Sequence, residues 1–205
     1  MNEKYKDLAE KYGLYLLDES ELEKIYECNV DAYIDHPLHK WLLGEYFNKD
    51  ICTKFWKAVI GSIKNEALFI ADGPEINGMS IWLPAGFKGM KSYPFLKNGG
   101  TKIPMSTYAR MITYENYAMN LKKKYTGHES WYLLNMAVRT YKQNMGVATS
   151  MMRPMMKFLA ESGQSCYLET HIEENVRFYN GFRFNTVEIG KVPNTDIAHF
   201  AMKYK

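Results

Sequence analysis

The stretch LLNMAVRTYKQNMGVATSMMRPMM, residues 133–156, decides the fold. It begins inside an apolar run, residues 131–138, whose length and composition predict a buried β-strand. It ends in apolar residues at helical spacing, which predict a helix from Gly146 to about Glu161. A glycine therefore opens this helix instead of closing it, at the point where the strand gives way to the helix.

The start of this helix is suited to bind a phosphate group. The first backbone N–H groups of a helix have no partner within it, and together they carry about half a positive charge. Gly146 allows a ligand to approach the backbone closely, and the small side chain of Ala148 does not obstruct it. We therefore expect the backbone donors from Asn144 to Thr149 to wrap a diphosphate, although a simple strand-to-helix turn shows the same pattern.

Strands and helices alternate along the rest of the chain. Hydrophobic spacing predicts further helices near residues 18–36, 39–47, 48–65, 106–124 and 174–180. Short apolar runs predict strands near residues 14–17, 67–73, 76–84, 166–170, 182–189 and 197–204. The stretch from Gly86 to Lys102 is rich in Gly, Lys and Pro and lacks periodicity, which predicts a mobile surface loop. The alternation favours an α/β fold with a mixed sheet.

Composition narrows the function classes. The 205 residues suit one compact domain, and the net charge of +3 is far from the one-sided basic charge of a dedicated nucleic-acid binder. The three cysteines are far apart and match no metal or redox spacing, which predicts free thiols in a reducing compartment. No apolar run is long enough to span a membrane, so we expect a soluble, cytoplasmic protein that uses neither a membrane nor a metal.

The stretch 133–156 resembles the acyl-CoA-binding core of the GCN5-related N-acetyltransferases, the GNAT family. The signature of that family is a strand followed by Gln or Arg, two residues, Gly, one residue, and Gly or Ala. In this sequence Gln143, Gly146 and Ala148 occupy those places.

A second segment, YLETHIEENVRFYNGFRF at residues 167–184, is similar to the family's second core motif. In that motif a strand leads to a helix with Asn and Tyr and then to a Gly-Phe pair, which Asn175, Tyr179, Gly181 and Phe182 match. The spacer between the tyrosine and the glycine is shorter here than is usual in the family, so we expect a shortened helix end.

Three upstream segments resemble a GNAT subgroup that includes puromycin acetyltransferase. They are DAYIDHPLHKWLLG at 31–44, GMSIWLPAG at 78–86 and GHESWYL at 127–133. The subgroup often has His directly before the Trp of the last segment, whereas this chain has Ser130 there and His128 two places earlier.

The resemblance implies an α/β GNAT fold and a single acyl-CoA N-acyltransferase domain over residues 1–205. This fold has a central, twisted, mixed sheet of about seven mostly antiparallel strands, which is flanked by helices and splayed between the fourth and fifth strands. It also implies a metal-free N-acetyltransferase, in which the amine of a small molecule attacks the thioester of acetyl-CoA directly in a ternary complex.

The resemblance also assigns the residues that bind acetyl-CoA. The strand at 131–138 offers its backbone to the pantetheine arm, and an N–H near Met136 or Ala137 polarises the thioester. The turn and the helix start bind the diphosphate, and Asn175 binds the pantetheine amides. The expected cofactor-binding residues are Met136, Ala137, Val138, Gln143, Asn144, Met145, Gly146, Val147, Ala148, Thr149 and Asn175.

Acyl transfer to an amine needs a proton acceptor for the amine and a proton donor for the departing thiolate. Glu169, at the end of a predicted strand, is the first candidate for the base, and His128 and His171 are alternatives. Tyr179 is the candidate acid, because a phenol stays protonated at working pH. Glu169 as a structural carboxylate and Tyr179 as a core residue are the competing interpretations.

The acceptor is expected to bind on the side opposite the cofactor, among aromatic residues of segments 33–47 and 104–121. These residues are Tyr33, His36, Trp41, Tyr108, Tyr114 and Tyr117. Nothing in the sequence selects one amine, or decides between a monomer and a homodimer. Two other classes stay open: a catalytically idle acyl-CoA sensor, and a nucleic-acid-associated protein that uses Lys122 to Lys124, which are otherwise a solvated helix end.

Overall fold

Seven strands form one sheet in the computed structural model, which describes residues 1–205. Their order is β1-β2-β3-β4-β5-β7-β6, and every neighbouring pair is antiparallel except β4 with β5. The predicted mixed and mostly antiparallel sheet is therefore confirmed. The strands are β1 (Tyr15–Leu16), β2 (Leu68–Ala71), β3 (Gly78–Leu83), β4 (Trp131–Val138), β5 (Cys166–Thr170), β6 (Asn185–Lys191) and β7 (Ala198–Tyr204).

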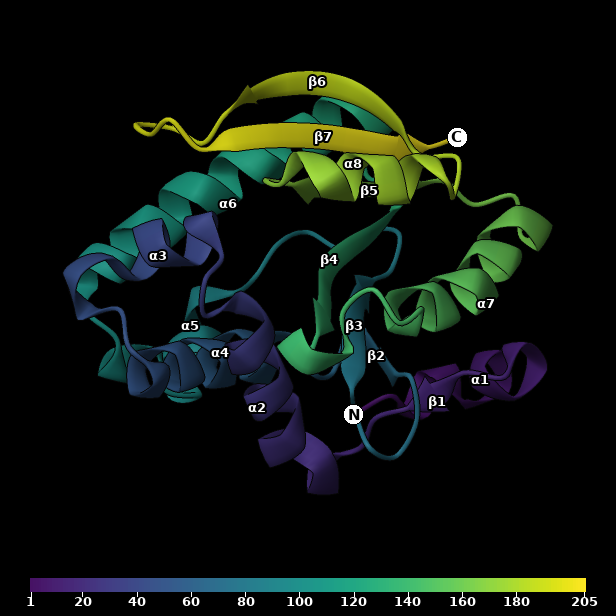
Figure 1. Cartoon of the computed structure of the whole chain (residues 1–205), viewed down its shortest axis with the longest axis horizontal. Coiled ribbons are helices and arrows are strands. Elements are labelled where there is room, and N and C mark those ends of the chain that lie inside the picture. The colour runs from purple at the N-terminus through teal and green to yellow at the C-terminus, as the bar shows by residue number, and fades with distance from the viewer.

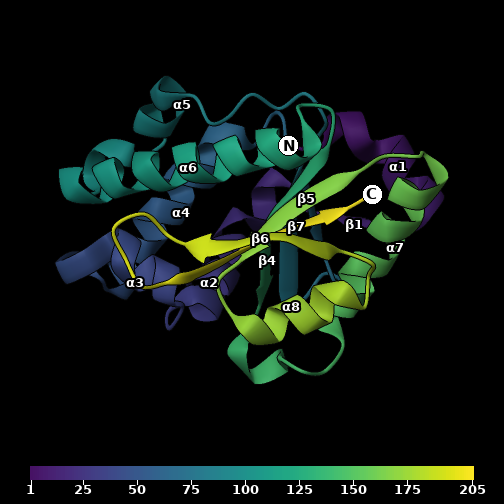
Figure 2. The ribbon, with the colours of Figure 1, turned by 90° about the horizontal axis from the view of Figure 1, so that it is seen from above.

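Helices cover both faces of this sheet (Figures 1 and 2). The helices α2, α4 and α6 pack on one side, and α7 and α8 lie on the other, with α1 beside α7. None of the helices is both long and apolar enough to cross a membrane. The helices are α1 (Lys6–Tyr12), α2 (Leu22–Tyr33), α3 (Pro37–Leu43), α4 (Lys49–Ile63), α5 (Ser92–Lys97), α6 (Met105–Thr126), α7 (Val147–Glu161) and α8 (Glu173–Asn180).

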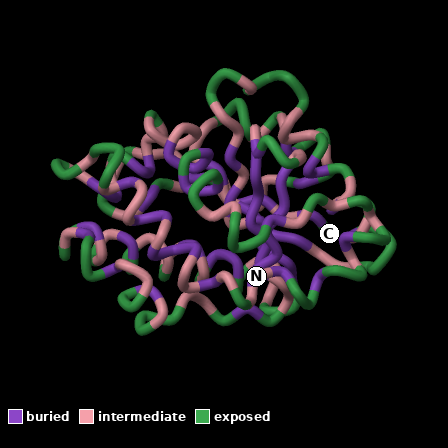
Figure 3. The backbone as a smooth tube through the Cα atoms, turned by 90° about the horizontal axis from the view of Figure 1, so that it is seen from below, coloured by how far each residue is buried: buried purple, intermediate pink, exposed green.

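The core consists of two apolar clusters, one on each side of the sheet. The alternation of side chains along β4 supplies both, because Tyr132 joins one cluster and Leu133 joins the other. A shift in the pairing with β3, between Ile81 and Trp82, then brings Ala137 to the same cluster as Tyr132. Figure 3 shows the buried backbone concentrated in the middle of the molecule, with exposed segments at its rim. Gly78 lets α7 approach β3, since a Cβ atom there would lie 2.5 Å from Val147 Cγ1.

The strands β4 and β5 separate soon after they begin. They pair only at Trp131 with Cys166 and at Tyr132 with Tyr167. Beyond these pairs β4 continues beside β3, and β5 continues beside β7. The edge of β4 that faces β5 is therefore unpaired over most of its length. The predicted splay between the fourth and fifth strands is confirmed.

The three cysteines, Cys28, Cys52 and Cys166, are free and buried. Burial raises the pKa of each thiol above its ordinary value. The free thiols predicted from the cysteine spacing are confirmed, and burial makes these thiols unreactive.

The surface loop predicted for residues 86–102 is wrong over its second half. This part forms the short helix α5 and a 3₁₀ turn at Gly100–Lys102. The side chain of Phe95 is only 1% exposed, and Asn98 Nδ2 donates a hydrogen bond to the Gly61 carbonyl at 3.1 Å. A helix of under two turns with one buried aromatic residue produces no repeating pattern, so periodicity could not reveal it.

The solvated helix end predicted for Lys122 to Lys124 is wrong for Lys122, which is only 2% exposed. Its Nζ lies 3.4 Å from the Gly127 carbonyl, and burial lowers the pKa of its ammonium group. Lys124 is exposed but forms an ion pair of 2.6 Å with Glu188. The helix continues to Thr126, so the three lysines point in different directions around its last turns and do not form one basic patch.

We predict that Phe95→Ala lowers the free energy of unfolding by about 3–5 kcal/mol, because it removes a fully buried ring and leaves a cavity. Urea unfolding followed by tryptophan fluorescence measures this change. Tyr93→Ala is the matched control on the same helix, since Tyr93 is 74% exposed, and it should change the free energy by less than about 0.5 kcal/mol. Equal effects of the two substitutions would contradict the docked position of α5.

Candidate active site

One cavity of about 950 Å³ occupies the splay between β4 and β5. At one end it is lined by the turn at 142–149, and at the other by side chains of α2, α3, α4 and α6. Side chains of β4, β5 and α8 lie between these ends. A cofactor and a second substrate therefore have one continuous space in which to meet.

The turn at the mouth of the cavity carries a run of free backbone donors. No acceptor in the chain receives a hydrogen bond from the backbone N–H groups of Asn144 to Thr149, and Ser150 is the first residue of α7 whose N–H is used. Asn144 and Gly146 have left-handed backbone conformations, with φ of 61° and 83°. Left-handed residues alternating with right-handed ones turn successive N–H groups toward one side, which creates an anion-binding concavity.

The left-handed backbone conformation at position 146 favours glycine, because residues with a side chain rarely adopt it. A Cβ atom at this position would meet no other atom within 4 Å. The glycine is therefore not needed for packing inside the protein, and the space above it is open to a ligand.

Two hydrogen bonds hold this turn in place. Gln143 Nε2 donates to the Val138 carbonyl at 3.2 Å, and Asp31 Oδ2 accepts from the Thr140 N–H at 2.6 Å. The sequence did not reveal the role of Asp31, because this residue lies on α2, far from the turn in the chain. The turn is thus fixed by both β4 and α2.

The open edge of β4 presents the backbone of Met136. Tyr33 donates a hydrogen bond from its hydroxyl to the Met136 carbonyl at 3.1 Å, so this carbonyl points away from β3. In an antiparallel strand the N–H and C=O of one residue point to the same edge, and the next residue points to the other. The Met136 N–H therefore faces the cavity, whereas that of Ala137 faces β3.

Most of the predicted cofactor-binding residues line the cavity. The two exceptions are Ala137, whose side chain is buried in the core, and Met145, whose side chain is 70% exposed. Met145 still contributes a free backbone N–H to the turn. The lining residues are Met136, Val138, Gln143, Asn144, Gly146, Val147, Ala148, Thr149 and Asn175.

Tyr179 lines the cavity from α8, with 7% of its surface exposed. Its hydroxyl has no hydrogen-bond partner in the protein, and burial raises the pKa of the phenol. The shortened turn is accommodated because the Tyr179 carbonyl accepts from both Phe182 N–H and Phe184 N–H, at 2.9 and 3.2 Å. The phenol is thus protonated and free to donate.

Glu169 lines the cavity from β5, and its two oxygens differ. Oε1 accepts a hydrogen bond from the Tyr132 hydroxyl at 2.8 Å, whereas Oε2 is buried and has no partner. Burial raises the pKa of this carboxyl to about 8. A carboxyl group that titrates near neutrality beside a cavity has the properties of a general base.

The two alternative bases differ in position. His128 is exposed in the turn between α6 and β4 and does not line the cavity, so the structure gives it no part in this site. His171 lines the cavity, and its Nε2 lies 3.1 Å from the Tyr114 hydroxyl. Burial, together with nearby histidines, lowers the pKa of His171 to about 2. His171 is therefore neutral and a weaker base than Glu169.

Four of the five histidines form a cluster, which the sequence did not predict because they come from three distant parts of the chain: α3, the end of β5 and β7. Their rings follow one another in the order His39, His36, His171 and His199, with centroids 5.3 to 5.8 Å apart. Burial lowers the pKa of each ring. They are not arranged to hold a metal ion. His36, His39 and His171 line the cavity as a neutral, aromatic wall, and His199 lies beside His171 outside the lining.

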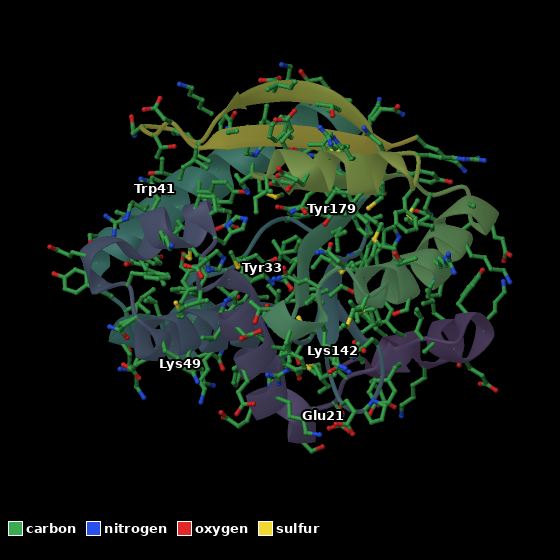
Figure 4. All side chains as sticks on the ribbon, viewed as in Figure 1. Glu21, Tyr33, Trp41, Lys49, Lys142 and Tyr179 are labelled. Carbon is green, nitrogen blue, oxygen red and sulfur yellow. The ribbon has the colours of Figure 1, made fainter.

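The predicted acceptor-binding aromatics divide into two groups. Tyr33, His36 and Tyr114 line the cavity, whereas Trp41, Tyr108 and Tyr117 do not. In Figure 4 Tyr33 and Tyr179 lie toward the centre of the molecule and Trp41 lies well to one side.

Three further residues line the end of the cavity away from the turn, where the acceptor is expected to bind and which we call the acceptor end. His39 stacks on both Tyr33 and Trp56, with ring centroids 4.6 and 5.3 Å apart, and the Tyr33 and Trp56 rings also contact each other, with centroids 5.5 Å apart. Glu115 on α6 also lines the cavity, and its Oε1 accepts from the Met90 N–H at 2.9 Å. The sequence did not single out these three residues, because Trp56 and His39 share helix faces with core residues and Glu115 is one of many acidic residues.

Neither a protein-family model nor a curated protein matches this sequence. Solved structures do match the fold. One is described as the histone acetyltransferase HPA2 and related acetyltransferase from Corynebacterium glutamicum, with a TM-score of 0.64, 15% identity and 93% of each chain covered. Another is named arylalkylamine N-acetyltransferase 7 of the yellow fever mosquito, with a TM-score of 0.63, 13% identity and coverage of 92% of this chain and 85% of that one.

A third structure is described as an acetyltransferase of the GNAT family from Desulfovibrio desulfuricans. It has a TM-score of 0.53 and 10% identity, and the match covers 94% of this chain and 96% of that one. These similarities, together with the seven-stranded sheet and its splay, show that the chain has the GNAT fold.

Proposed function

We propose that this protein transfers the acetyl group of acetyl-CoA to the amine of a small molecule. The observation that carries the proposal is the run of free backbone donors from Asn144 to Thr149. These donors lie at the mouth of a cavity that continues to Glu169, Tyr179 and an aromatic chamber. The fold shared with solved acetyltransferases supports the same reaction class.

The diphosphate of acetyl-CoA binds to these donors, because helix N-termini and N–H concavities favour anions. Lys142, which also lines the cavity, adds a positive charge beside the turn. The pantetheine arm follows the open edge of β4, where Met136 offers its backbone, and Asn175 binds its amides from α8. The thioester then lies between β4 and β5, close to Glu169 and Tyr179.

In the proposed reaction the neutral amine attacks the thioester carbonyl. A carbon–nitrogen bond forms, the carbon–sulfur bond breaks, and the Met136 N–H stabilises the negative charge that develops on the carbonyl oxygen. Glu169 accepts the proton that the amine loses, and Tyr179 donates its proton to the departing sulfur. The products are the acetylated amine and free CoA, and solvent returns both groups to their starting states.

The acceptor end of the cavity favours an apolar or aromatic amine. Its walls include Tyr33, His39 and Trp56, and the only Lys or Arg in the lining is Lys142, at the cofactor end. A small amine with an aromatic body suits such walls. The solved structure named for arylalkylamine acetylation agrees with this substrate class. The likeness to the puromycin acetyltransferase subgroup stays a sequence-based prediction.

We predict that Gly146→Glu abolishes acetyl-CoA binding, because a side chain and a negative charge then occupy the diphosphate position. Calorimetric titration with acetyl-CoA measures this. Gly163→Glu is the matched control, since Gly163 also has a left-handed φ and open space around it but lies beyond the far end of α7. Weak binding by both variants, or normal binding by Gly146→Glu, would contradict the diphosphate assignment.

We expect Tyr179→Phe to lower turnover by roughly 10²-fold with little change in acetyl-CoA affinity, because it removes only the proton donor. Thiol release over a panel of amines measures turnover. Tyr204→Phe, at another buried tyrosine outside the cavity, should retain activity. If Tyr179→Phe is fully active, Tyr179 is not the acid. If the wild-type protein binds acetyl-CoA but releases no thiol with any amine, the protein is an idle acyl-CoA sensor.

The activity should rise as pH increases through about 8, since the base form of Glu169 appears only when its carboxyl loses a proton at that pKa. A weakly basic amine that is neutral over the whole range isolates this ionisation from that of the acceptor. Glu169→Gln should remove this step in the profile of kcat/KM and lower activity by about 10²–10⁴-fold. A step that persists near pH 8 in the variant would assign it to another group.

A further inference from the structure

The proposed acetyl transfer leaves one acidic residue at the acceptor end of the cavity without a role. This residue is Glu115, on the face of α6 that lines the acceptor end. Met111, Ala118 and Met119 lie one helical turn away on the same face and also line the cavity. The carboxylate therefore projects from an apolar stripe, where water solvates it poorly.

The two oxygens of Glu115 have different surroundings. Oε1 accepts the Met90 N–H at 2.9 Å, which fixes the carboxylate against the segment that follows β3. Oε2 has no partner in the protein and is not enclosed by it. No lysine or arginine forms an ion pair with Glu115. Glu115 therefore offers one accessible carboxylate oxygen to which a ligand can donate a hydrogen bond.

Glu115 and Glu169 occupy different places in the cavity. Burial raises the pKa of both carboxyls, but neither contributes to the pKa shift of the other. Glu169 lies on β5 beside the splay, whereas Glu115 is tied to Met90. The two carboxyls are therefore not a coupled pair.

We propose that the acceptor carries a second hydrogen-bond donor, remote from its reacting amine, and that Glu115 binds this group through Oε2. The donor is a hydroxyl or an ammonium group, since either one satisfies a carboxylate. An aromatic ring between the two polar ends fits the stacked wall of Tyr33, His39 and Trp56. This substrate class rests on the proposed acetyl transfer and narrows it to ring-hydroxylated arylalkylamines and aromatic diamines.

Two matched pairs of amines test the proposal. Phenethylamine is compared with tyramine, which adds a hydroxyl, and benzylamine with 4-(aminomethyl)benzylamine, which adds an ammonium group. The wild-type enzyme should prefer the donor-bearing member of a pair by at least about tenfold in kcat/KM, as expected for a hydrogen bond to a charged group. The pair that shows the preference identifies which donor Glu115 accepts.

The variant Glu115→Gln separates binding from folding. Its amide oxygen still accepts the Met90 N–H, so the segment stays anchored, but the negative charge is lost. In this variant the ratio of kcat/KM for the donor-bearing amine to kcat/KM for its matched partner should fall about tenfold. Glu129→Gln, at an exposed carboxylate outside the cavity, is the control and should keep it.

A wild-type enzyme without preference in either pair, or a preference unchanged in Glu115→Gln, would overturn this inference. Calorimetric binding of the same amines to the CoA-bound protein gives a readout that does not need turnover. If no amine is acetylated, the proposed acetyl transfer fails. The role of Glu115 is then decided by whether Glu115→Gln weakens binding of the donor-bearing amine.

Discussion

The separation of β4 from β5 determines where every other part of the candidate site lies. These two strands share only two residue pairs, and after Tyr132 the edge of β4 has no strand beside it. An unpaired strand edge inside a protein is costly, because its N–H and C=O groups need partners. Here Tyr33 donates to the Met136 carbonyl and Gln143 to the Val138 carbonyl, and this edge otherwise faces the cavity. Glu169 and Tyr179 both line this space.

Several buried polar groups without a hydrogen-bond partner lie around this space. Glu169 Oε2, His36 Nδ1 and His39 Nδ1 are buried without partners, and all three residues line the cavity. Each such group costs stability unless a ligand or water satisfies it. Proteins accept this cost mainly where binding or catalysis needs it, which agrees with a site for two substrates. Apart from Glu169 and Glu115, the acceptor end is neutral, because burial keeps its histidines uncharged.

Local patterns in the sequence predicted the strands and the glycine at the turn into α7, whereas the splay was predicted by the resemblance to the GNAT family. An apolar strand, a glycine at a helix start and the spacing of Gln143, Gly146 and Ala148 are all visible in one segment. Contacts between distant segments were not predictable, since no periodicity encodes them. Asp31 holds the turn from α2, and four histidines meet from α3, from the end of β5 and from β7. The burial of Lys122 was also not predictable from the sequence. A lysine at a helix end is usually solvated, but tertiary packing buries this one.

A crystal structure of the protein with acetyl-CoA tests the central claim most directly. The account predicts that diphosphate oxygens lie about 2.7–3.2 Å from backbone nitrogens between Asn144 and Thr149, with the pantetheine arm beside Met136. The account would be contradicted by a diphosphate bound elsewhere. It would also be contradicted if, in the complex, the N–H groups of Asn144 to Thr149 donated hydrogen bonds to acceptors of the protein itself.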